Sequence, residues 1–432
     1  MVDPVAIWLL LGSFVVLILV GIDIAFAIGF ATIITTLYLG LPLQMVAMNM
    51  IKGINVFSLM AVPFFIVAGE IMGSGGISKR LVGMSKSLVG WLRGSLAMVN
   101  VMASMFFGGI SGSAAADTSA LGSMLIPMME KDGYDTDFAT AVTLSSSVQG
   151  ILIPPSHNMV IYALAAGSVS IGRLFLGGMV PGIILGVALM IFSYFVSVKR
   201  NYPVGDKFNL LHFLRSAGSS FWGLGTVVIV VVGVVAGIFT ATESAAIAVL
   251  YAFLVTFFIY REIPLKEVFG ILYRSVKTLS VVMIVVAMAT AFGWLVSYLQ
   301  IPKMLTDAIF SFSTNKFVIL IIMNILLLFL GAFLNMVSII LIMTPILLPI
   351  AQTIGIDPVH FGVIMILNLG IGLITPPVGT VLYIGSAVSG LSIEKISKAL
   401  LPFYGVMILV LLLVTYVPQV VMFVPDLLMP LK

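Results

Sequence analysis

Two proline pairs stand inside long apolar segments, and both could expose backbone groups to a ligand. Pro154-Pro155 lies within Phe138–Gly167, and Pro376-Pro377 lies within Val359–Val388. Because proline has no backbone N–H and its ring clashes with the preceding turn, each pair must interrupt a helix. The interruption frees carbonyl oxygens that can face a cation. The helix that starts after the break offers N–H groups that favour an anion.

Glycine-rich segments interrupt two further apolar stretches. Leu96–Met129 is broken at 108–113, with the sequence GGISGS, and Phe317–Ile350 is broken near 331–336. We interpret each stretch as a re-entrant hairpin whose two half-helices enter and leave a membrane on the same side. Glycine lets the tip turn and lets another backbone approach closely. Hydroxyl groups that suit a small hard cation such as Na⁺ stand beside the breaks: Ser111, Ser113, Ser145, Ser146, Ser147, Ser156, Thr375 and Thr380.

The composition indicates that a lipid bilayer surrounds these breaks. The chain has 432 residues, of which 61% are hydrophobic and 8% charged, whereas about a quarter of a soluble chain is charged. The apolar runs approach the roughly 20 residues that span a bilayer and do not alternate as the strands of a barrel would. We therefore predict an all-α polytopic membrane protein. Its remaining spans are Val5–Val20, Ile24–Leu39, Asn55–Ile71, Leu174–Val198, Leu224–Phe239, Glu243–Tyr260, Leu279–Leu299 and Leu400–Val417.

Several function classes are excluded by what the sequence lacks. Without cysteine, the chain has no disulfide, thiolate metal site or cysteine nucleophile. The net charge of +4 is too small and too dispersed for nucleic-acid binding. A G-x-x-x-x-G-K-[ST] loop for ATP is also missing from the sequence.

The basic residues predict the orientation of the chain. If both hairpins are re-entrant, fifteen of the 20 Lys and Arg residues fall on one side, mainly in 79–93, 199–215 and 261–277. The positive-inside rule makes that side cytoplasmic. Both termini are then expected on the opposite, periplasmic face.

The two halves of the sequence are related by a shift of 222 residues. Pro127 matches Pro349, Asp135 matches Asp357, and the proline pairs match each other. One hairpin opens from each face, so the halves form an inverted repeat, a common plan of secondary transporters. The predicted fold is thus a helical bundle with inverted repeats, two re-entrant hairpins and two discontinuous helices. We divide it into scaffold helices at 1–95 and 218–315, transport-domain halves at 96–170 and 316–390, a connecting helix and basic loop at 171–217, and a C-terminal helix at 391–432.

At these residues the chain resembles the large, DctM-type membrane subunit of the tripartite ATP-independent periplasmic (TRAP) transporters. The resemblance rests on FFGGISGSAAADTSALGSMLIPMM at 106–129, SSSVQGILIPPSHNMVIYALAAG at 145–167, GIFTATESAAIAVLYAF at 237–253 and NLGIGLITPPVGTVLYIGSAVSG at 368–390. It implies sodium-driven uptake of an organic acid, such as sialic acid or a C4-dicarboxylate, across the bacterial inner membrane. It also implies a periplasmic binding protein, a small four-helix membrane subunit of the DctQ type, and an elevator motion.

The resemblance further implies two sodium sites at the hairpin tips and helix breaks. Carried over to this sequence, the sodium-binding residues are Ser111, Gly150, Ile153 and Pro154 in one site and Gly331, Gly372, Thr375 and Val378 in the other. From position alone, we expect the substrate between the two tips, near Ser113, Ser156, Asn158, Asn335 and Thr380.

Three other functions stay open at this point. The segment Gly109–Gly112 fits the short G-x-S-G pattern of rhomboid-like intramembrane serine proteases, with His157 as a base for Ser111. Position 379, opposite His157 in the repeat, is glycine, and a protease needs no inverted repeat. A stand-alone sodium–dicarboxylate symporter and a passive channel are the other two alternatives. Asp117 and Glu243 are ionisable groups in apolar stretches, which suggests either function or helix capping.

Overall fold

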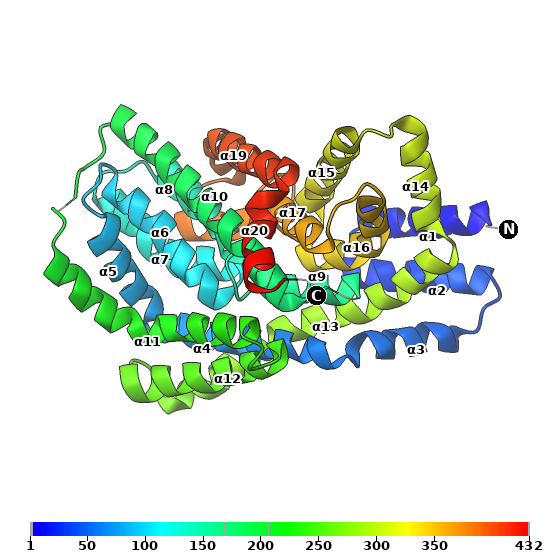
Figure 1. Ribbon diagram of the computed structural model, residues 1–432, viewed down its shortest axis with the longest axis horizontal. Helices are drawn as coiled ribbons and strands as arrows, with labels where there is room; N and C mark the ends of the chain where they lie inside the picture. Colours follow the sequence, from blue (N-terminus) through cyan, green and yellow to red (C-terminus); the bar gives the residue numbers. More distant parts are fainter. Residues whose placement is uncertain (1–2, 168, 206, 431–432) are drawn as a thin grey trace.

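The 222-residue repeat governs the order of the helices in the computed structural model (Figure 1). The structure describes residues 3–167, 169–205 and 207–430. The first half contains α1 (Pro4–Leu19), α2 (Ile24–Tyr38), α3 (Leu43–Ile54), the 3₁₀ turn η1 (Phe57–Met60), α4 (Ala61–Ser74), α5 (Ile77–Val89), α6 (Ser95–Ser111), α7 (Ala114–Lys131), α8 (Thr136–Ser147), the 3₁₀ turn η2 (Val148–Ile151), α9 (His157–Ala166) and α10 (Ile171–Lys199).

The second half repeats this order, except that the equivalents of α3 and α4 are joined into one long helix. It contains α11 (Leu210–Val235), α12 (Ala241–Leu254) with its π-helical end η3 (Val255–Tyr260), the 3₁₀ turn η4 (Leu265–Glu267), α13 (Val268–Tyr298), α14 (Ile301–Phe312), α15 (Lys316–Phe333), α16 (Met336–Thr353), α17 (Pro358–Gly372), α18 (Thr380–Ser389), α19 (Ile393–Tyr416) and α20 (Pro418–Leu428). Adding 222 to the bounds of α7 gives those of α16. The same shift places α3 and α4 together on the single long helix α13.

Both hairpins and both discontinuous helices are present. The first hairpin is α6–α7 and the second is α15–α16, while α8–η2–α9 and α17–α18 form the two interrupted helices. The halves exchange partners, because α9 packs on α16 of the second half and α18 packs on α7 of the first. This reciprocal packing is what an internal two-fold relation between the repeats requires. It leaves the first break, at 148–156, largely buried, whereas Pro376, Pro377 and Val378 of the second break are exposed.

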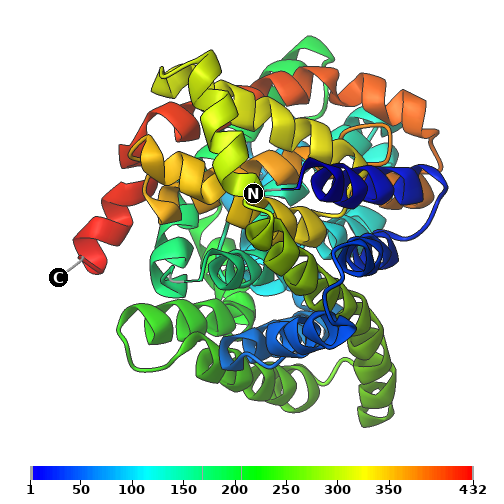
Figure 2. The same ribbon diagram turned by 90° about the vertical axis from the view of Figure 1, so that its right-hand side faces the viewer.

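The prediction of an all-α polytopic membrane protein is confirmed. Within the described residues, eight helical segments are long and apolar enough to cross a bilayer. They are Phe57–Ser74, Ile171–Lys199, Leu210–Val235, Ala241–Tyr260, Leu265–Tyr298, Lys316–Phe333, Met336–Thr353 and Ile393–Tyr416. In the turned view, α1, α2 and α3 follow one another down one side, and α20 projects at the opposite edge (Figure 2).

Four helices were absent from the sequence-based description. The basic segment 79–93 is largely α5, and α3, α14 and α20 were missed as well. Each is short or carries apolar residues on one face only, so a search for continuous hydrophobicity passes over it. For the same reason α11 and α13 begin earlier than expected. The C-terminal region is two helices instead of one, because Pro418 starts a new helix.

The basic segments meet at one end of the molecule, on the left in Figure 1. Arg80 forms an ion pair with Glu262 at 2.5 Å, and Arg93 Nε donates to the Tyr202 carbonyl at 3.3 Å. These contacts join 79–93 to both later basic segments. We call this region the basic end. The first turns of α1 and α3 lie toward the other end.

Candidate functional site

The first hairpin touches the first helix break through a pair of glycines. A Cβ atom built on Gly108 would lie 2.2 Å from the Cα of Gly150, and one built on Gly109 would lie 3.2 Å from the Pro154 carbonyl oxygen. Carbon atoms normally approach no closer than about 3.5 Å. Any side chain at Gly108 would therefore push the hairpin off the break, which explains the glycine.

The second half repeats this contact. A Cβ built on Gly372 would lie 2.7 Å from the backbone carbonyl carbon and the Cα of Gly331. The tip and the break are also hydrogen-bonded, since the Ala332 carbonyl accepts from Val378 N at 3.0 Å and from Gly379 N at 3.3 Å. Each hairpin is thus held against the break of its own repeat.

The two breaks adjoin each other. A Cβ on Gly370 of α17 would lie 2.4 Å from Cδ1 of Ile151 and 2.9 Å from Cγ1 of Val148. Since Ile151 and Val148 belong to η2, the first break packs directly against the second interrupted helix. The peptide bonds Pro154–Pro155 and Pro376–Pro377 are both cis.

A buried polar cluster lies beside the first break. The Ser104 hydroxyl donates to Oδ1 of Asp117 at 3.0 Å, and Asp117 is fully buried. Asn100 Nδ2 donates to the Thr143 hydroxyl at 2.7 Å, and the Ser146 hydroxyl donates to Asn100 Oδ1 at 3.3 Å. These side chains come from α6, α7 and α8, so the cluster joins the hairpin to the interrupted helix.

Several buried oxygens of this region have no hydrogen-bond partner among the described residues. They are Asp117 Oδ2, Thr118 Oγ1, Gln149 Oε1 and Ser156 Oγ. A Cβ built on Gly150 would lie 3.4 Å from Asp117 Oδ2, so this carboxylate oxygen is directed at the break. Buried polar atoms are nearly always satisfied, and oxygen ligands suit a hard cation. The unpaired Asp117 oxygen beside the first break is therefore a group of the kind that suits Na⁺.

At the second break, hydroxyl groups are bonded to backbone carbonyls. The Thr375 hydroxyl donates to the Ile371 carbonyl at 2.7 Å, and the Tyr404 hydroxyl donates to the Ile374 carbonyl at 2.6 Å. The residue equivalent to Asp117 is Ile339. A cation here would be held by hydroxyl and carbonyl oxygens without a carboxylate.

The predicted sodium-binding residues fall into two local groups. Gly150, Ile153 and Pro154 face the first tip, where Ser111 precedes the turn and its Oγ accepts from Ser113 N at 3.4 Å. Gly331 and Gly372 are in contact, and Thr375 and Val378 lie within a few residues of that contact. Ion binding by either group remains a prediction.

The predicted substrate-binding residues are divided between two places. Ser113 and Asn335, which the 222-residue shift relates, cap the second half-helix of each hairpin: Ser113 Oγ accepts from Ala116 N and Asn335 Oδ1 accepts from Val337 N. Capping uses their oxygens and leaves a hydroxyl proton and an amide group able to donate to an anion.

The three other predicted substrate residues differ in burial. Ser156 and Asn158 are buried beside the first tip, whereas Thr380, at the start of α18, is exposed. Asn335 is exposed as well. The cavity beside the first tip contains no residue of the second tip.

A cavity of about 500 Å³ adjoins the first tip. Ser111, Ser113 and His157 line it from the hairpin side, and Glu70 of α4 and Arg274 of α13 line it from the other side. Its size suits a small organic molecule. We call it the basic-end cavity, because Arg274 and Glu70 lie near the basic end.

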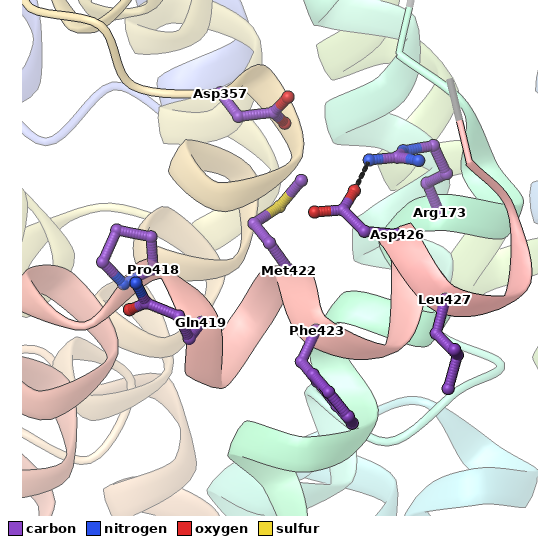
Figure 3. Close-up of a pocket in the computed structure, with 8 residues that line it drawn as sticks. All are labelled: Arg173, Asp357, Pro418, Gln419, Met422, Phe423, Asp426 and Leu427. Atoms are coloured by element: carbon purple, nitrogen blue, oxygen red, sulfur yellow. Dashed lines mark hydrogen bonds and ion pairs between the residues drawn. The ribbon is translucent and has the colours of Figure 1, made fainter. Parts of the chain in front are cut away.

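Another cavity lies away from the breaks, under α20 (Figure 3). Arg173, buried to 96%, pairs with Asp426 at 2.5 Å and also donates to the carbonyl oxygens of Pro425 and Met429. None of the predicted site residues lines this cavity. The contacts of Arg173 fasten α20 to α10.

The protease hypothesis gains no support from the geometry. Although Ser111 and His157 line the same cavity, the Ser111 hydroxyl interacts with the backbone of Ser113, and no hydrogen bond joins it to His157 among the described residues. Glu243 forms a capping box with Thr240 at the start of α12. Of the two possibilities left open for Glu243, capping is confirmed.

Sequence reasoning missed Asn100, Ser104 and Gln149. Their only signal was a polar side chain within an apolar helix. Gln149 Nε2 donates to the Val101 carbonyl at 2.6 Å, a contact between α6 and η2 that no local pattern could indicate.

Comparisons with known proteins agree with the fold. Residues 11–420 match the family model of the tripartite ATP-independent periplasmic transporter, DctM component. The isethionate TRAP transporter permease protein DctMQ of Oleidesulfovibrio alaskensis is 40% identical over 98% of this chain and 66% of that protein. The sialic acid TRAP transporter large permease protein SiaM of Vibrio cholerae is 41% identical over 95% of this chain and 96% of that protein. The solved YdaH transporter of Alcanivorax borkumensis has a TM-score of 0.62 and 13% identity, with 86% of each chain covered, which bears on the fold alone.

Proposed function

The chain belongs to the DctM component family of the tripartite ATP-independent periplasmic transporters, and on this basis we propose that it carries out sodium-coupled uptake of an organic acid. It is a multi-pass membrane permease and not an enzyme. The proposed substrate is an anion of the sialic acid or C4-dicarboxylate type. The named relatives take sialic acid and isethionate, both organic acids.

The observation that carries the proposal is the doubled contact between hairpin glycine and break glycine. Gly108 meets Gly150, and Gly331 meets Gly372. At the first break the carbonyl oxygens of Pro154 and Pro155 lie against the tip glycines Gly109 and Gly112, and at the second break the Ala332 carbonyl of the tip accepts from Val378 N and Gly379 N. Na⁺ binding there would hold the tip closed, so the ion and the substrate anion would stabilise the same arrangement. Coupling of that kind is reciprocal: each ligand raises the affinity for the other.

The structure also suggests how the substrate would cross. Ser111 and Ser113, on the first tip, share the basic-end cavity with side chains of α4 and α13. We propose an elevator motion in which the hairpins and interrupted helices slide against α4 and α13. The tip would then face the basic end in this conformation and the other end after the motion.

The orientation and the partners belong to the same proposal. By the positive-inside rule the basic end is cytoplasmic, and both termini lie on the periplasmic side of the inner membrane. A periplasmic binding protein would deliver the substrate, and a small four-helix membrane subunit would brace the chain. The DctMQ relative extends beyond the matched region, which leaves room in that protein for a second component.

Uptake into proteoliposomes tests the proposal. The permease with its small subunit is assayed with labelled substrate, with and without the cognate binding protein, and with and without an inward sodium gradient. We expect the labelled substrate to accumulate only when the binding protein and the sodium gradient are both present. Uptake that needs neither would overturn the proposal. Uptake that needs sodium but not the binding protein would favour a stand-alone symporter.

A further inference from the structure

Two cavities lie along α13, one toward each end of the molecule. The basic-end cavity is lined by α13 residues from Arg274 to Val282. A second cavity, of about 690 Å³, is lined by α13 residues from Val286 to Ser297 and by α3, η1, α9 and α16. We call it the far-end cavity. Arg274 and Trp294 are 20 residues apart on one helix, or about 30 Å, which is the thickness of a bilayer core.

The two cavities are equivalent under the 222-residue shift. Lys52 of the far-end cavity corresponds to Arg274 of the basic-end cavity, and Val56 corresponds to Thr278. On the hairpin side, Leu341 and Pro345 correspond to Ser119 and Ser123. Each cavity therefore carries a basic side chain at the same place in its repeat, on the helices that we assign to the scaffold.

The surroundings of the two basic side chains differ. Arg274 Nε lies 3.4 Å from Glu70 Oε2, and Arg274 Nη2 donates to the Ser74 hydroxyl at 3.1 Å. The equivalent of Glu70 is Phe292, which is buried. Accordingly, no carboxylate lines the far-end cavity, and Lys52 has no ion pair within the described residues.

This difference gives the two cavities unequal attraction for an anion. An unpaired ammonium group in a cavity raises the local concentration of anions. A guanidinium group that already faces a carboxylate attracts a second anion less, because the substrate must compete with Glu70. One cavity thus favours capture of an anion and the other favours its release.

We propose that Lys52 and Arg274 are a repeat-related pair of recognition residues for the acidic group of the substrate, and that Glu70 weakens Arg274 so that the substrate is released at the basic end. The inference rests on the proposed function, because it takes an organic acid as the cargo. It adds a direction, with Lys52 acting on entry and the Glu70–Arg274 pair acting on exit.

The role of Lys52 in substrate entry, which we call the entry arm of the proposal, is tested with Lys52→Gln. In proteoliposomes with the binding protein and a sodium gradient, we expect the concentration of loaded binding protein at half-maximal uptake to rise about three- to fivefold, the scale of a partly solvated ion pair. Lys303→Gln is the matched control. It removes a lysine from α14 that lines neither cavity, and we expect no change. Equal effects of the two variants would overturn the entry arm.

The role of the Glu70–Arg274 pair in substrate release, which we call the exit arm, is tested with Glu70→Gln. Vesicles are loaded with unlabelled substrate, and inhibition of uptake by this internal substrate is measured. Without its carboxylate partner, Arg274 should bind the internal anion more tightly. We therefore expect half-inhibition at a concentration about three- to fivefold lower, with a slower maximal rate. Glu130→Gln, an exposed acid on α7, is the control.

A double variant shows whether Glu70 acts through Arg274. Adding Arg274→Gln to Glu70→Gln should return half-inhibition to the wild-type concentration or above it. An inhibition curve unchanged in Glu70→Gln, or a shift that persists in the double variant, would overturn the exit arm. Thermal unfolding in detergent confirms that each variant is folded. Wild-type protein that shows neither sodium nor binding-protein dependence would refute the proposed function. Wild-type dependence with unaltered variants would refute this inference alone.

Discussion

The contact between Gly108 and Gly150 predicts a specific defect in Gly108→Ala. The new Cβ would lie 2.2 Å from the Cα of Gly150, whereas carbon atoms need about 3.5 Å. The hairpin must therefore move about 1.3 Å from the break. Overpacking of this kind typically costs about 1–3 kcal/mol, and only backbone stands in the way, so rotation of a side chain cannot relieve it.

The strain acts on the closed tip, which is the arrangement that Na⁺ is proposed to stabilise. A coupling of about 1–3 kcal/mol corresponds to a change of roughly 5- to 150-fold in ligand affinity. We expect the sodium concentration for half-maximal uptake to rise within this range. Helix propensity favours alanine over glycine by about 1 kcal/mol, so thermal stability should fall less than sodium affinity does.

The assay is the initial rate of uptake into proteoliposomes as a function of external sodium, together with thermal unfolding in detergent. Gly83→Ala is the control, because a Cβ there meets nothing within 4 Å. Gly331→Ala should be milder than Gly108→Ala, since its Cβ would lie 3.2 Å from the Gly372 Cα. A sodium curve for Gly108→Ala that matches wild type, in a folded protein, would refute the reasoning.

Three further outcomes are expected. Thr375→Ala should weaken sodium activation several-fold, whereas Thr353→Ala, which removes the same type of hydroxyl-to-carbonyl hydrogen bond outside the site, should not; equal sodium curves would contradict this. His157→Ala should leave sodium-dependent uptake at least partly intact, because His157 forms no hydrogen bond with Ser111 among the described residues; a complete loss of uptake in a folded variant would contradict this. Arg173→Gln should loosen α20 by about 1–3 kcal/mol and speed its proteolysis, whereas Lys398→Gln, which removes an exposed ion pair, should change proteolysis little; similar cleavage of both would argue against fastening by Arg173.

The interruptions of the helices could be predicted because their causes are local. Pro154-Pro155 and Pro376-Pro377 cannot continue a helix wherever they occur, and the glycines at 108–112 permit a turn in any context. The inverted repeat was equally accessible, since it depends only on matches at a constant spacing. The structure extends that spacing to helices that hydropathy missed, such as α5 and α14.

Other features depend on contacts that local sequence cannot indicate. Gln149 reaches the Val101 carbonyl across 48 residues, and Arg274 meets Glu70 across 204. The difference in burial between the predicted substrate residues was also inaccessible: Ser156 is buried and Thr380 is exposed, although each lies within three residues of a proline pair. Neighbouring elements of the bundle decide burial at each break.

The course of α13 has an electrical consequence. Val282 lines the basic-end cavity and Val286 lines the far-end cavity, yet these residues are one helical turn apart, or about 6 Å. If each cavity opens to the water on its own side of the membrane, a wall of one helical turn would separate the two aqueous compartments, and most of the voltage across the bilayer would drop over it. Moving one elementary charge across this wall would change its electrical energy by nearly the full amount for crossing the membrane, which is about 2.3 kcal/mol per 100 mV. A short displacement of the tip could thus couple a large share of the membrane potential to transport.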